Sequence, residues 1–158
     1  MILVSACLLG TNCRYDGGNC LNNRIKETLK NYEYKAICPE LAGNLSIPRS
    51  PAEIKGGSGE SVLEGKSRVI TKDGVDLTKN FLCGARKAIQ GIEIDDIDFA
   101  ILKERSTSCG VKEIYNGEFT GSLQKGSGVS TAYFISKDII VFSEEEVDKK
   151  REKLIELD

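Results

Sequence analysis

The sequence contains no histidine. This absence excludes Ser-His-Asp and Cys-His catalytic machinery, and it excludes every zinc site that needs an imidazole ligand. Proton transfer near neutral pH must then be carried by a glutamate, aspartate, lysine, cysteine or tyrosine whose pKa is shifted.

The chain also lacks a long hydrophobic run and an excess of positive charge. No stretch approaches the roughly 20 apolar residues that span a bilayer, and the apolar start, Met1 to Gly10, has no basic residues before it and is too short for a signal peptide. The sequence has 22 Lys and Arg residues and 24 Asp and Glu residues, which gives a net charge of -2, and it shows no stripe of basic residues that could bind nucleic acid. We therefore expect a cytoplasmic protein with no membrane or nucleic-acid partner.

The order of apolar patterns predicts the fold class. The 158 residues are enough for one compact domain, so we expect residues 1–158 to form a single domain. Strands are expected at 2–6, 34–38, 97–103 and 139–142, and helices at 23–32, 78–90, 129–136 and 144–157. Strands that alternate with helices predict an α/β domain with a mainly parallel, Rossmann-like sheet flanked by helices.

Two intervening segments have their own signals. Residues 41–59 are rich in proline and glycine and are expected to form a long ordered loop, which suggests a lid or a binding segment. Residues 62–77 predict a small β-hairpin insertion, because Asp73-Gly74 is a strong turn pair between two apolar runs. A second glycine-rich stretch covers residues 110–128.

Three of the six cysteines follow expected strands. Cys7, Cys38 and Cys109 each stand just past the carboxyl end of a strand, the edge of an open α/β sheet where ligands bind. If the strands are parallel neighbours, the three thiols meet at one rim. Cys83 lies inside an expected helix, where a cysteine is usually a small buried hydrophobe, and Cys20 has no neighbours that imply chemistry.

All-sulfur coordination selects zinc or an iron–sulfur cluster. The sequence has no C-x-x-C knuckle and no closely spaced ferredoxin run. Dispersed cysteines on separate strand ends instead suggest a cluster in a preformed cavity, and three ligands would leave one iron with an open position, as in a catalytic site. Cys13, close to Cys7, is a candidate fourth ligand or sulfur acceptor.

Several motifs spread over nearly the whole chain belong together. They are Val4–Gly10, Cys13–Gly17, Cys38–Glu40, Pro48–Ile54, Ser106–Gly110 and Gly126–Val129. Each is weak by itself, but the combination is specific. It resembles a bacterial family that was long uncharacterised and is now associated with thiouracil desulfurase.

The resemblance implies a [4Fe-4S] cluster held by only three cysteines and a non-redox removal of sulfur from a thiolated pyrimidine. Transferred to this sequence, the resemblance makes Cys7, Cys38 and Cys109 the metal ligands, with Glu40 and Ser106 as catalytic neighbours. The substrate is then a small thiolated nucleobase.

The expected chemistry is consistent with the residue types. A thiocarbonyl sulfur is soft and would bind an open iron, which polarises the carbon–sulfur bond so that water can add to the carbon. Glu40 is a candidate base, Ser106 can position water or a ring nitrogen, and Arg49 can bind a carbonyl of the base. Glu40 as a helix-starting carboxylate and Ser106 as a turn former are the structural alternatives. For Arg49 the alternative is an ion pair with Glu53.

The match has two departures, and the function has two rivals. Thr107 stands where the family pattern usually has proline, and Ala42 where it usually has glycine. The first rival is a persulfide carrier that uses Cys13 as the sulfur acceptor and needs no iron. The second rival is a metal-binding or ligand-binding module without turnover.

Overall fold

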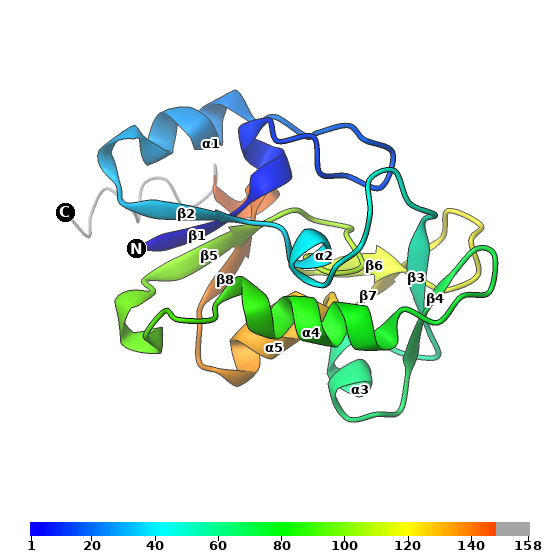
Figure 1. The fold of residues 1–158 in the computed structure, drawn as a ribbon. Coiled ribbons are helices and arrows are strands. Elements are labelled where there is room, and N and C mark those ends of the chain that lie inside the picture. The colour runs from blue at the N-terminus through cyan, green and yellow to red at the C-terminus, as the bar shows by residue number, and fades with distance from the viewer. Residues whose placement is uncertain (148–158) are drawn as a thin grey trace.

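The structure is a computed structural model that describes residues 1–147. Its centre is a parallel four-stranded sheet in the order β2-β1-β5-β8 (Figure 1). The strands are β1 (Ile2–Ser5), β2 (Tyr34–Ile37), β5 (Phe99–Leu102) and β8 (Val141–Ser143). The predicted fold class, a mainly parallel α/β sheet flanked by helices, is confirmed.

Helices cover both faces of this sheet (Figure 1). The helices are α1 (Asn23–Thr28), α4 (Thr78–Ala88) and α5 (Val129–Ser136). Successive strand residues point to opposite faces, so Ile2 and Val4 of β1 pack in a cluster with Ile25 of α1, whereas Leu3 packs in a cluster with Ala88 of α4 and Phe134 of α5. All four residues of β1 are buried, as expected of a central parallel strand.

The first predicted helix is shorter than its pattern suggests. The Asn22 side chain accepts a hydrogen bond from the Ile25 N–H, so Asn22 is the N-cap of α1. After Thr28 the chain tightens into a 3-10 turn, Leu29–Asn31, before β2 begins. At the other end of the chain, residues 144–147 are helical, and the rest of the helix predicted for 144–157 lies outside the described residues.

A second group of elements packs beside the carboxyl edge of the sheet. It consists of two antiparallel pairs, β3 (Ala52–Lys55) with β4 (Arg68–Thr71) and β6 (Glu113–Tyr115) with β7 (Leu123–Lys125), and the helices α2 (Pro39–Ala42) and α3 (Gly59–Leu63). Their apolar side chains form a third buried cluster together with Phe81 of α4 and Val129 of α5; the other members are Ile54, Val62, Val69 and Ile114.

The loop predicted for 41–59 and the hairpin predicted for 62–77 are partly wrong. The first contains β3, and the true partner of β4 is β3 rather than the run after Asp73-Gly74. The predicted turn does exist, because the Thr71 N–H donates to the Val75 carbonyl, but only an isolated bridge follows it. Residues 110–128 likewise hold β6 and β7, which the sequence did not indicate.

Candidate active site

The order of the central strands sets the place of the site. Strand β1 lies inside the sheet, with β2 on one side of it and β5 and then β8 on the other. The chain therefore winds in opposite directions on the two sides, and the switch lies between β1 and β5. In open α/β sheets, the carboxyl ends of the strands at such a switch point flank the ligand crevice. Cys7 follows β1 in a 3-10 turn, Cys38 follows β2 directly and Cys109 lies in the loop after β5.

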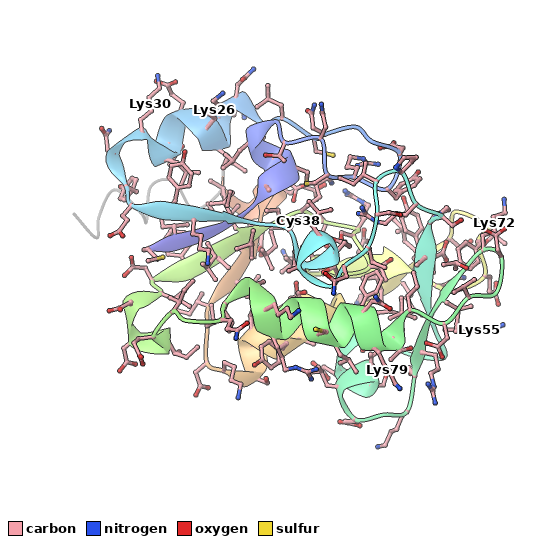
Figure 2. The ribbon with its side chains drawn as sticks, in the orientation of Figure 1. Lys26, Lys30, Cys38, Lys55, Lys72 and Lys79 are labelled. Carbon is pink, nitrogen blue, oxygen red and sulfur yellow. The ribbon has the colours of Figure 1, made fainter. Side chains whose placement is uncertain are left out.

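A cavity of about 520 Å³ opens at this edge, a volume in the usual range for small-molecule sites. Its walls include every side chain that the sequence singled out for the site: Cys7, Cys13, Cys38, Glu40, Arg49, Ser106 and Cys109. Figure 2 labels Cys38 at the junction of β2 and α2, near the middle of the molecule. The structure thus brings together residues from separate parts of the chain.

Cys13 links two of the candidate ligands. A hydrogen bond with Cys38 acts to lower the pKa of the Cys13 thiol, but its contact with Cys7, burial and the Glu40 charge together raise that pKa to about 11. The same contact with Cys13, followed by burial and Glu40, raises the pKa of Cys38 far above its usual value. Cys13 therefore lies close enough to Cys7 and Cys38 for each of them to shift the pKa of its thiol.

Cys109 completes the set from the other side of the cavity. Its side chain is buried, and this burial, with smaller contributions from Glu40 and Cys38, raises the pKa of its thiol. Free thiols in this setting are protonated at neutral pH, so a metal that binds them must displace their protons.

Glu40 lies in the first turn of α2, with Pro39 at the first position of the helix. Pro39 suits that position because its fixed φ angle and missing N–H cost nothing there. The Cys38 thiol donates to Oε2 of Glu40 across 3.5 Å. Glu40 thus occupies the helix-starting position considered for it from the sequence, and it also lines the cavity.

Ser106 shapes the loop that carries Cys109. Its Oγ accepts the N–H of Ser108 at 3.2 Å and of Cys109 at 3.0 Å, so the turn-forming alternative for this serine is correct. Its hydroxyl hydrogen still remains for donation into the cavity. The hydroxyl of Thr107 donates to the Ala52 carbonyl at 2.6 Å and ties the loop to β3, which the proline usual at this position could not do.

The start of helix α5 is hydrogen-bonded to the same loop. The N–H groups of Gly128, Val129 and Ser130 donate to carbonyls of the loop between Thr107 and Gly110 at 2.8 to 3.0 Å. A side chain at Gly128 would meet the backbone of Ser108, so only glycine permits this approach. The loop is therefore held in one conformation before any ligand binds.

Arg49 binds backbone carbonyls in the cavity wall rather than the carboxylate of Glu53. Its guanidinium donates to the carbonyls of Cys13 at 3.0 Å and Ser46 at 3.2 Å, and its own N–H donates to the Tyr15 carbonyl. The pairing with Glu53 considered from sequence is wrong. Arg49 instead joins the Cys13 loop to the segment before β3.

Cys20 and Cys83 lie outside the cavity walls. Arg14 donates to the Cys20 sulfur at 2.8 Å, and Cys83 lies on α4 next to basic side chains on another part of the surface. The interpretation of both as bystanders to the cavity is consistent with these positions.

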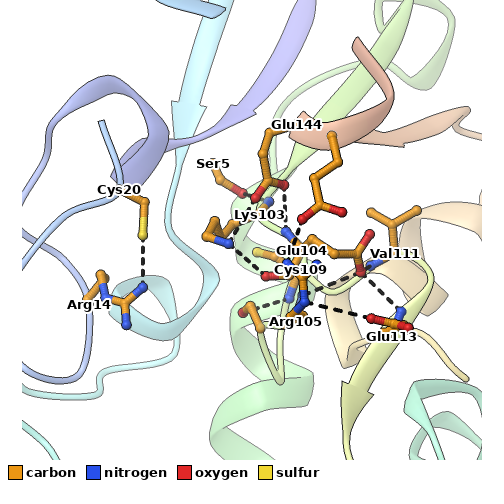
Figure 3. Close-up of polar contacts among 12 residues, drawn as sticks. Ser5, Arg14, Cys20, Lys103, Glu104, Arg105, Cys109, Val111, Glu113 and Glu144 are labelled. Carbon is orange, nitrogen blue, oxygen red and sulfur yellow. Dashed lines mark hydrogen bonds and ion pairs between the residues drawn. The ribbon is translucent and has the colours of Figure 1, made fainter. Parts of the chain in front are cut away.

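Sequence reasoning missed Tyr115 of β6 and Phe119 of the loop after it as cavity residues, and it considered Glu53 of β3 only as an ion-pair partner of Arg49. It also missed Glu104, whose Oε1 accepts the N–H groups of Val111, Lys112 and Glu113 at 2.8, 2.9 and 3.1 Å (Figure 3). A carboxylate directly after a buried strand was the available signal for Glu104, since such a group commonly binds the backbone of the next loop.

The cavity suits an iron–sulfur cluster better than a single metal ion. Among residues 1–147, no three His, Cys, Asp or Glu groups converge on a position for one ion. A cluster has a different geometric requirement, because each thiolate binds a different iron and the sulfur atoms need not surround one metal position. Four free thiols around one cavity meet that requirement.

Fold and cavity together define a parallel α/β protein with a thiol-lined site at its switch point. The chain belongs to the 2-thiouracil desulfurase family, whose model matches residues 2–146. The resemblance seen in the sequence motifs is therefore confirmed.

Two relatives span almost the whole chain. The uncharacterized protein YbbK of Bacillus subtilis (strain 168) is 42% identical over 148 residues, which cover 94% of this chain and 98% of YbbK. The solved structure of the [4Fe-4S]-dependent thiouracil desulfidase TudS has a TM-score of 0.82 at 40% identity and covers 97% of this chain and 96% of its own. Within residues 1–147, no helix has the length and hydrophobicity of a transmembrane span.

Proposed function

We propose that this chain is a [4Fe-4S]-dependent enzyme that removes sulfur from a thiolated pyrimidine such as thiouracil. The observation that carries the proposal is the meeting of Cys7, Cys38 and Cys109, from the ends of three adjacent strands, with Glu40 in one cavity. The name of its solved relative, a [4Fe-4S]-dependent thiouracil desulfidase, supports both the cofactor and the substrate class.

Cys7, Cys38 and Cys109 would hold the cluster, with Cys13 beside them as a further ligand or as a contact for the substrate. When bound, a cluster with one iron free of protein ligands supplies a soft Lewis acid for the thiocarbonyl sulfur. The net reaction exchanges the sulfur for the oxygen of one water and releases hydrogen sulfide. No electron donor or acceptor is needed.

The protein's own groups move the protons. Glu40 takes a proton from the water that adds to the thiocarbonyl carbon and returns it to the departing sulfur, which leaves as hydrosulfide. The second proton of the water is lost to solvent as the new carbonyl forms, so the net products are the oxo ring and hydrogen sulfide. Ser106 donates its hydroxyl hydrogen to the substrate, because its oxygen is already occupied by the backbone of its own turn. Arg49 fixes the Cys13 loop and so keeps that thiol at the cavity wall.

The persulfide carrier is less well supported. Cys13 is 3% exposed, whereas a carrier must present its sulfur to a second protein. We also propose a cytoplasmic location, since all six cysteines are free thiols and the cluster needs them reduced.

The test is anaerobic reconstitution followed by measurement of iron, acid-labile sulfide and turnover. About four iron and four sulfide per chain are expected for one cubane, with sulfide and uracil released from 2-thiouracil in equal amounts. Protein that binds no iron would favour the persulfide carrier. Protein that binds the cluster but releases no sulfide from any thiolated base would be a binding module.

A further inference from the structure

Glu53 is a buried acidic side chain to which no role has so far been given. It lies in the middle of β3 and is 9% exposed. Its neighbour Ile54 packs into the apolar cluster of the second group of elements. Because successive strand side chains point to opposite faces, Glu53 is directed away from that cluster, and it lines the active-site cavity.

Only one oxygen of Glu53 is occupied. Oε1 accepts the N–H of Gly117 at 3.0 Å and the N–H of Phe119 at 3.2 Å. Within residues 1–147, Oε2 has no hydrogen-bond partner and the carboxylate forms no ion pair. Among the described residues the one buried side-chain oxygen without a partner is Oγ of Ser143, so Oε2 of Glu53 is accessible in the cavity, where it can accept an N–H from a ligand.

Phe119 is held in an unusual backbone conformation by the same carboxylate. Its φ angle is 57°, in the left-handed region that bulky residues rarely adopt. The chain reaches it through Gly117, which packs so closely on β3 that a side chain there would approach the Ile54 carbonyl to 2.5 Å. Strained backbone of this kind clusters at ligand sites, and Phe119 lines the cavity.

We propose that Glu53 and Phe119 recognise the ring of the substrate. Oε2 of Glu53 accepts a ring N–H next to the thiocarbonyl, and Phe119 packs on the face of the ring. This inference rests on the proposed function and deepens it: the substrate must be a planar thioamide heterocycle that keeps that N–H. Alkylation of the nitrogen would remove the donor and select against the molecule.

The first experiment pairs a residue with a substrate atom. The holoenzyme and its Glu53→Gln variant are assayed with 2-thiouracil and with its 1-methyl and 3-methyl derivatives. The substituted amide keeps an oxygen for the N–H groups of Gly117 and Phe119 but replaces the free acceptor with a donor. We expect the substitution to lower kcat/KM for 2-thiouracil by about ten- to a hundred-fold.

We expect one of the two methylations to lower the kcat/KM of the wild-type enzyme by a similar factor. The same methylation should lower the kcat/KM of Glu53→Gln by less than about three-fold. A double-mutant cycle of this kind isolates the pairwise contact from steric effects of the methyl group. Equal losses from methylation in both enzymes would overturn the proposal.

The matched control is Glu118→Gln. Glu118 lies in the same hairpin loop and does not line the cavity, so its substitution should leave kcat/KM unchanged. For Phe119, replacement by leucine keeps an apolar side chain without a ring face, and we expect about a ten-fold higher KM with little change in kcat. A fall in kcat with unchanged KM would count against ring packing.

A second measurement separates this inference from the proposed function. Binding of uracil, the product, is measured by calorimetry on the same proteins and needs no turnover. Uracil affinity should fall about ten-fold or more in Glu53→Gln and stay constant in Glu118→Gln. If the wild-type protein binds uracil no better than Glu53→Gln, the recognition role is wrong. If it binds uracil as expected but releases no sulfide, the catalytic proposal alone fails.

Discussion

The Sγ of Cys38 lies 3.5 Å from Oε2 of Glu40, in the first turn of α2. The two residues are separated only by Pro39, which begins the helix. A candidate metal ligand and a candidate base therefore share one rigid short segment, and the position of one fixes the position of the other.

Glu40→Gln tests the base directly. Glutamine keeps the volume and a hydrogen-bond acceptor for Cys38 but cannot take a proton from water. We expect the variant to retain its iron and sulfide content and its absorption spectrum while kcat falls by about 10²- to 10⁴-fold. Loss of the cluster together with activity would show that Glu40 supports cluster binding instead.

Cys109→Ser tests the ligand set, with Cys83→Ser as the matched control. Cys109 lines the cavity and is buried, whereas Cys83 lies on α4 away from it. We expect Cys109→Ser to lose most of its iron and all its sulfide release, and Cys83→Ser to keep both. Melting temperatures of the cluster-free proteins check that neither variant is simply unfolded. Equal iron content in the two variants would contradict the assignment of Cys109.

The central sheet and the thiol cluster were predictable because the chain marks them locally. Strands β1 and β5 are continuous apolar runs that are mostly buried, and a cysteine follows each of them. Strand β2 is an exposed edge strand in which only Ile37 is buried, and Cys38 follows it directly. The rule that parallel strands share a carboxyl edge then brings Cys7, Cys38 and Cys109 together without any knowledge of the loops.

The part of the cavity formed by β3, β6 and the loop after β6 could not be predicted in the same way. The two strands have four and three residues, too few to establish a period, and β3 follows Pro51 directly. Their pairing depends on contacts between residues far apart in the sequence, such as Glu53 with Gly117. Short-range periodicity carries no signal for such contacts.

Gly84→Ala tests how α4 places α2. The two helices lie side by side (Figure 1), and a side chain at Gly84 would run into the Pro39 carbonyl. Because α2 carries Glu40 and follows Cys38, the variant should lose roughly 1 to 3 kcal/mol of stability through overpacking and bind less iron. Lys87→Ala, an exposed change on the same helix, should alter neither property. Unfolding in urea and iron content are the measurements, and a Gly84→Ala protein equal to wild type in both would contradict the packing argument.

Glu104 predicts how stability depends on pH. Burial by itself would raise the pKa of Glu104. Hydrogen bonds from the N–H groups of Glu113, Lys112 and Val111 lower the pKa by more than burial raises it, so the pKa lies below the usual value of a glutamate (Figure 3). A carboxyl group whose pKa is lowered in the folded protein stabilises the fold fully at any pH above its pKa in the unfolded chain, which is about 4.3. This contribution is lost as the pH falls through the pKa of the folded state.

We therefore expect Glu104→Gln to lower the free energy of unfolding at pH 7 by roughly 2 kcal/mol, the value of hydrogen bonds to a charged group. The difference from wild type should shrink as the pH falls below about 4, because protonation then removes the charge from the native residue as well. Urea unfolding at pH 7, 5, 4 and 3 measures both proteins under the same conditions. A difference that stays constant over this range would mean that shape rather than charge holds the loop after β5, and with it Cys109.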